Sequence, residues 1–119
     1  MNLTRLFQFC AWGSLAAIGA LSMVSPSLRP VTALPHDVEH AAIFALAGLA
    51  VALGYPRHAL RHVIMLTAFS ATVELAQIFV PGRHARISDF LVDAAAASAG
   101  VLLASTLMKL TRAKAASHP

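Results

Sequence analysis

Residues 90–110 read FLVDAAAASAGVLLASTLMKL, an apolar run whose only basic residue, Lys109, stands beside its end. A run of this length is typical of a transmembrane helix, because about 20 apolar residues cross the hydrocarbon core of a bilayer. Lys109 fits such a helix, since its long side chain can extend toward the membrane surface. The run therefore predicts a membrane span.

Three further apolar runs precede it, at residues 6–24, 38–54 and 63–80, and none of them contains Lys or Arg. A composition that is 58% hydrophobic and 12% charged is far from that of a soluble domain. Short connectors favour antiparallel neighbours. We expect one all-α domain over residues 1–119, an integral membrane bundle of four spans. The alternative for the first run is a cleaved secretory signal, which its length and the three later runs disfavour.

Basic residues are unequally divided between the two ends of the predicted bundle. If the spans alternate in direction, six Lys and Arg residues lie at the end that holds the termini and the connector at residues 55–62. Three lie at the opposite end. Cytoplasmic loops are enriched in Lys and Arg, so we predict that both termini are cytoplasmic. The basic residues form no aromatic-interleaved stripe, so we expect no nucleic-acid partner. The six are Arg5, Arg57, Arg61, Lys109, Arg112 and Lys114, and the three are Arg29, Arg83 and Arg86.

All the acidic residues fall at the opposite, outward end. Ionisable groups at membrane depth are costly unless they are paired or wetted, so this cluster needs a reason beyond solubility. Helical spacing places neighbouring members on shared faces, and Arg83 lies on the connector above them. We predict a polar pocket at the outer face. Its candidate residues are Asp37, His40, Glu74, Gln77, Arg83, Asp89 and Asp93, with Glu39 and His36 beside them.

Some of these residues can be explained without a pocket. Asp37 and Asp89 each begin a predicted helix, where an acid satisfies free backbone N–H groups. Glu74 and Asp93 are not explained in this way and need partners, for which Arg83 and Arg86 are nearest in sequence. Four residues have imidazole or carboxylate side chains of the kind that bind zinc or manganese. Their spacing matches no recognised metal site, so we expect no metal and no cofactor. These four are His36, His40, Glu74 and Asp89.

Small residues recur every four positions in three of the runs, a spacing that allows close helix packing in membranes. An alanine-rich helix also produces such spacings by chance. The positions are Ala16 and Ala20, Gly48 and Ala52, and Ala96, Gly100 and Ala104.

The segments DVEH at residues 37–40, ELAQIFVPGR at 74–83 and SD at 88–89 are similar to the VanZ-like family of bacterial membrane proteins. The similarity extends over about residues 35–105. It departs from the family at Asp93, where the family usually has asparagine. The resemblance implies a bacterial inner (cytoplasmic) membrane protein of the cell envelope, since the family is named after a protein linked to teicoplanin resistance. It marks Asp37, His40, Glu74, Gln77, Arg83 and Asp89 as the polar signature.

Three functions follow from these features. The first is binding of a lipid or cell-wall headgroup at the outer face, with Arg83 and Arg86 pairing an anionic group of the ligand. The second is an accessory subunit of a larger membrane complex, in which the polar cluster holds the helices together. The third is a small intramembrane hydrolase or transferase with His40 or Glu74 as general base. Membrane lipids are the expected partners, and the sequence leaves open whether the protein is an enzyme.

Overall fold

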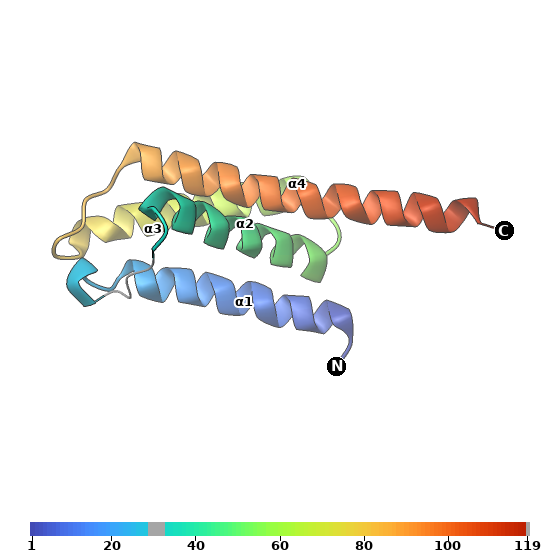
Figure 1. Ribbon diagram of the computed structural model, residues 1–119, viewed down its shortest axis with the longest axis horizontal. Helices are drawn as coiled ribbons and strands as arrows, with labels where there is room; N and C mark the ends of the chain where they lie inside the picture. The colour runs from blue at the N-terminus through green and yellow to red at the C-terminus, as the bar shows by residue number, and fades with distance from the viewer. Residues whose placement is uncertain (29–32, 119) are drawn as a thin grey trace.

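The computed structural model describes residues 1–28 and 33–118, and in this part of the chain every regular element is a helix (Figure 1). The predicted all-α fold is confirmed. Arg29, counted above with the outer face, lies outside the described residues. The elements are α1 (Leu3–Ser22), η1 (Pro26–Leu28), α2 (His36–Gly54), α3 (Ala59–Ala76), η2 (Gln77–Phe79) and α4 (Ile87–Ser117).

Successive α-helices run in opposite directions (Figure 1). One end of the bundle holds both chain termini and the α2–α3 connection, and we call it the terminal end. At the other end α1 and α3 finish while α2 and α4 begin, and we call it the distal end. Helix α4 is the longest, with 31 residues, and continues past its neighbours at the terminal end (Figure 1).

Helix α2 packs most extensively against α4, while α1 covers α2 and α3 covers α4. The α2–α4 crossing is close because two glycines face it. A Cβ atom on Gly48 would collide with the carbonyl oxygen of Ala97, and one on Gly100 would collide with that of Ala45. The small residues of these two segments therefore make the close contact that their spacing predicts.

Helix α1 packs differently, since Ala16 and Ala20 are exposed and make no such contact. Near the terminal end, Gln8 Nε2 donates to the carbonyl oxygen of Gly54 at 3.0 Å. Trp12 Nε1 donates to the hydroxyl of Tyr55 at 2.8 Å, which ties α1 to the C-cap residue of α2.

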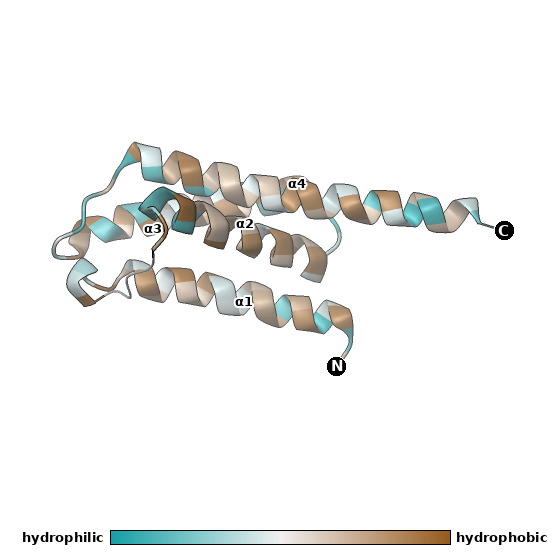
Figure 2. Ribbon diagram, in the orientation of Figure 1, coloured by the Kyte–Doolittle hydropathy of each residue, from teal (hydrophilic) through white to brown (hydrophobic). Residues whose placement is uncertain are grey.

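Among the described residues, three helices are long and apolar enough to cross a membrane: α2, α3 together with η2, and α4. Figure 2 shows hydrophobic residues along their length and hydrophilic residues near both ends of the bundle. Large apolar side chains such as Leu46, Leu75 and Leu102 are exposed on the outside, where lipid would solvate them. The chain is thus a helical membrane protein. Helix α1 is not among the three, since Arg5 and Gln8 lower its apolar content, and its span stays a prediction.

Helix bounds differ from those of the apolar runs that predicted them. Helix α3 begins at Ala59 rather than at residue 63, and α4 continues to Ser117 rather than ending at residue 110. Backbone hydrogen bonds continue through polar residues at helix ends, whereas hydropathy records only the apolar part.

Candidate functional site: the polar cluster at the distal end

The acidic residues of the chain gather at the distal end, as predicted. Asp37 and Glu39 lie in the first turn of α2, and Asp89 lies in that of α4. Glu74 lies in the last turn of α3, and Asp93 lies one turn deeper along α4. Three helices therefore contribute to one polar cluster.

Asp93 is bonded to His40 on the neighbouring helix. The Nδ1 atom of His40 lies 3.1 Å from Oδ1 of Asp93, and the two side chains are 11% and 1% exposed. The His40 ring also stacks on Phe44, with centroids 6.5 Å apart, and reaches an apolar cavity of about 240 Å³ between α1 and α2. The arginines were the candidate partners nearest in sequence, whereas the side-chain bond that Asp93 makes here is to His40 of α2. The pair joins α2 to α4.

Glu74 is compensated by backbone rather than by an arginine side chain. Its Oε1 atom accepts from the backbone N–H of Arg86 at 2.5 Å, where Arg86 is the N-cap residue of α4. A carboxylate here also lies near the positive end of the α4 dipole. The side chain of Arg86 is exposed. The arginine predicted beside Glu74 is therefore present, but its amide makes the bond.

Two buried polar atoms of this cluster lack a hydrogen-bond partner among the described residues: Oε2 of Glu74 and Nε2 of Gln77. Both residues are less than 10% exposed, at 6% and 4%. A groove of about 270 Å³ between the end of α3 and the start of α4 is lined by Glu74 and Arg86. Its remaining walls are mainly apolar, from residues such as Leu75 and Phe90. The groove thus has a hydrogen-bond acceptor, Glu74, and a cation, Arg86, beside apolar walls.

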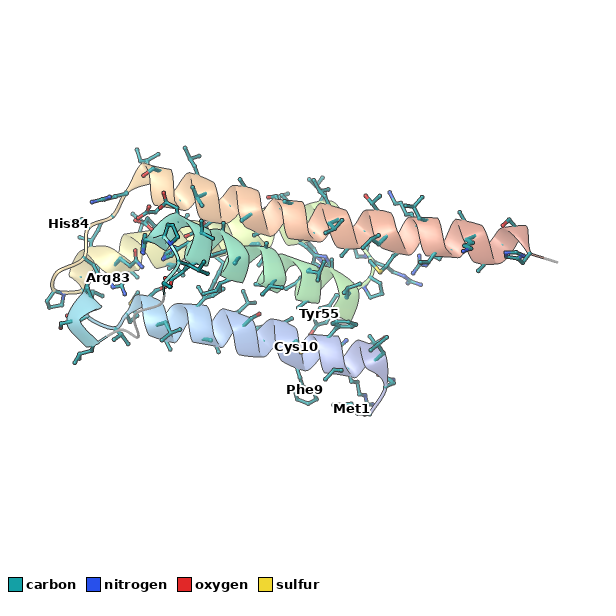
Figure 3. The ribbon with its side chains drawn as sticks, in the orientation of Figure 1. Met1, Phe9, Cys10, Tyr55, Arg83 and His84 are labelled. Atoms are coloured by element: carbon teal, nitrogen blue, oxygen red, sulfur yellow. The ribbon has the colours of Figure 1, made fainter. Side chains whose placement is uncertain are left out.

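Arg83 donates hydrogen bonds to backbone carbonyls at and just after the end of α1. Its Nε atom donates to the carbonyl oxygen of Val24 at 2.8 Å, and Nη2 donates to that of Leu21 at 3.2 Å. Figure 3 shows Arg83 on the α3–α4 connector beside the end of α1. Ser25 Oγ donates to the carbonyl oxygen of Pro81 at 3.1 Å in the same region. Arg83 therefore satisfies carbonyls at the α1 C-terminus, and the expectation that it pairs with Glu74 or Asp93 finds no support in these bonds.

Asp37 and Asp89 lie at the rim of the cluster. Helices α2 and α4 begin one or two residues before them, and the N-cap positions belong to Pro35 and Arg86, neither of which makes a side-chain cap bond. The two acids therefore act through the helix dipole rather than as N-caps. Asp37 is exposed and Asp89 is half-buried.

Ser70 belongs to the inner side of the cluster, although the sequence did not single it out. Its side chain is fully buried, and its hydroxyl lies 3.4 Å from the carbonyl oxygen of Phe90. Ser70 precedes Glu74 by four residues and so lies on the same face of α3. This four-residue spacing from Glu74 is the sequence feature that could have identified Ser70. Over residues 1–28 and 33–118, no group of three or more His, Cys, Asp and Glu side chains is arranged to hold a metal ion.

Fold and site together define a class: a small helical membrane protein with a buried ionisable cluster near one end of its spans. The model of the VanZ/LLP1 family matches residues 3–109, which is most of the chain. The chain therefore belongs to the VanZ/LLP1 family, which confirms the resemblance inferred from the motifs. No curated protein and no solved structure matched the chain significantly.

Proposed function

We propose that the distal end binds the headgroup of an envelope lipid or lipid-linked cell-wall precursor, with Glu74, Gln77 and Arg86 as the contacting residues. The observation that carries the proposal is the pair of buried atoms, Oε2 of Glu74 and Nε2 of Gln77, that lack partners among the described residues. A buried polar atom left unpaired costs about 1–3 kcal/mol. A ligand that donates to the carboxylate and accepts from the amide would remove that cost.

The groove favours a lipid headgroup over a soluble ligand. Its apolar walls suit the first methylene groups of an acyl or prenyl chain, and the exposed guanidinium of Arg86 suits a phosphate. The matching ligand combines a phosphate with a hydroxyl or ammonium donor. With the termini in the cytoplasm, this groove would open toward the outer leaflet.

The other cluster residues would support the site without touching the ligand. The His40–Asp93 bond holds α2 against α4, and Arg83 holds the α3–α4 connector against α1. Arg83 therefore has a positioning role in this proposal, in contrast to the ligand-pairing role expected from the sequence.

A headgroup comparison tests the proposal. The full-length protein in phosphatidylcholine nanodiscs is titrated with phosphatidylethanolamine, which has ammonium donors that phosphatidylcholine lacks. Saturable NMR shifts of the Arg86 amide are expected, because that amide bonds to Glu74. Arg86→Gln keeps the amide but removes the cation that pairs the phosphate, which both lipids carry. In neutral detergent, where no phosphatidylcholine competes for the site, this substitution should weaken binding of short-chain phosphatidylethanolamine about fivefold, since one surface cation contributes about 1 kcal/mol.

The matched control is Asp37→Asn, an exposed acid at the same end of the bundle. This substitution should change the affinity by less than about twofold, since an exposed charge near the site contributes little. Glu74→Gln should remove the preference for phosphatidylethanolamine. Equal binding of both lipids by the unaltered protein would refute the proposed role of Glu74.

A further inference from the structure

The terminal end contains a second pocket of about 260 Å³, between the α2–α3 connection and α4. It is separate from the distal cluster and lies at the opposite end of the bundle. Its polar lining is basic or neutral, and no acid lines it. Its lining includes the polar or charged residues Arg57, His58, His62, Ser105, Lys109 and Arg112.

Three permanent cations converge on this pocket from two elements that are distant in sequence. Arg57 lies on the connection, whereas Lys109 and Arg112 lie three residues apart on one face of α4. None of these three side chains forms an ion pair with another described residue, and the acids lie at the distal end. A cleft lined by charge of one sign concentrates ions of the opposite sign.

The start of α3 adds hydrogen-bond donors to the same pocket. The N-cap residue His58 has a left-handed backbone with φ of 63° and makes no side-chain cap bond. The first N–H groups of α3 therefore lack a side-chain acceptor, and helix N-termini of this kind bind phosphate. His62 also lines the pocket, is 5% exposed, and its imidazole makes no hydrogen bond to another described residue.

We propose that this terminal pocket binds the phosphate group of an anionic phospholipid. Lipid is the favoured source of the phosphate because the pocket adjoins membrane-facing surface: Met108 lines it, and Leu60 and Leu107 are exposed nearby. The Trp12–Tyr55 hydrogen bond lies at the same end, and such aromatic residues are enriched at the level of the headgroups. Basic pockets between membrane helices bind phosphate-bearing headgroups.

The test compares two lysines of one helix. The full-length protein in neutral detergent is titrated separately with short-chain phosphatidylglycerol, phosphatidylcholine and inorganic phosphate, while the amide signals of residues 57–62 and 105–112 are followed by NMR. Phosphatidylglycerol should cause saturable shifts. Lys109→Gln should weaken that binding about fivefold. Lys114→Gln makes the same charge change on α4 outside the pocket lining, and should alter the affinity by less than about twofold.

Equal weakening by both substitutions would refute the pocket in favour of diffuse surface attraction. Saturation by inorganic phosphate at the same concentrations as phosphatidylglycerol would overturn the assignment to lipid and indicate a soluble phosphate compound. Because the shifted amides belong to the terminal end, the outcome is independent of binding at Glu74.

Discussion

Glu74 and Asp93 are both buried carboxylic acids at the distal end, yet their surroundings differ in kind. Asp93 has a side-chain partner in His40, so its hydrogen bond is made within the protein. Glu74 receives one backbone N–H on Oε1, and its second oxygen has no partner among the described residues. Asp93 is therefore suited to holding helices together, and Glu74 is suited to receiving a ligand.

Substitution of Asp93 tests this division at the residue scale. Asp93→Ala leaves the largely buried His40 side chain without its acceptor and should lower the free energy of unfolding by about 1–3 kcal/mol. Asp93→Asn retains a carbonyl oxygen that accepts from Nδ1, so its cost should stay below about 1 kcal/mol. Unfolding in mixed detergent micelles measures both. Equal losses would mean that the charge of Asp93, and not its hydrogen bond, stabilises the bundle.

Residue spacing predicted which side chains gather at the distal end but not which ones bond. Helical periodicity places Glu74 near Gln77 and Asp89 near Asp93. The choice of His40 over an arginine for Asp93 depends on how α2 is rotated against α4, which spacing within one helix does not contain. The direction of Arg83 depends on the turn around Gly82, whose φ is +80°.

The α2–α4 crossing is the central contact at the scale of elements. Lipid provides no hydrophobic drive between membrane helices, so packing must come from close approach. Gly48 and Gly100 allow it, because each lies against backbone of the facing helix. The contact also sets the position of the His40–Asp93 bond, which joins the same two helices one to two turns away.

Adding one methyl group to that crossing should be costly. Gly48→Ala places a Cβ against the carbonyl of Ala97 and should lower the free energy of unfolding by about 1–3 kcal/mol. Gly13→Ala is the matched control, since open space surrounds Gly13 and alanine favours a helix by up to about 1 kcal/mol. Thermal unfolding of both variants in detergent compares them. A Gly48→Ala protein as stable as Gly13→Ala would contradict the close crossing.

Helix number and type were predictable from hydropathy, whereas the packing order was not. Short connectors suggested that consecutive helices pack together, yet α2 contacts α3 far less than it contacts α4. Steric fit decides this order, since Gly48 of α2 lies against backbone of Ala97 on α4, and Gly100 of α4 lies against backbone of Ala45 on α2. The small residues of α1 followed the same spacing but are exposed, so spacing alone does not distinguish a contact from an alanine-rich surface.

On the scale of the whole molecule, the two ends differ in charge. The acids lie at the distal end, and most Lys and Arg residues lie at the terminal end or on the projecting part of α4. With this polarity the positive-inside rule predicts that the terminal end lies in the cytoplasm. The two proposed sites would then face opposite leaflets.

Cysteine labelling tests the predicted topology. In a Cys10→Ser background, His84→Cys should react with a membrane-impermeant maleimide in intact cells. Thr4→Cys and Ser117→Cys should react only after permeabilisation, because four spans return both termini to the cytoplasm. Labelling of Thr4→Cys together with His84→Cys would mean that α1 does not cross the membrane.

The most direct test of the headgroup site is the mass of the intact particle extracted from its native membrane in mild detergent. We predict a monomer or small homo-oligomer that retains lipid, and loss of that lipid in the Glu74→Gln, Arg86→Gln double variant while the oligomeric state is kept. A lipid-free protein recovered in a large stoichiometric assembly would contradict the binding site and favour an accessory subunit whose polar cluster is structural.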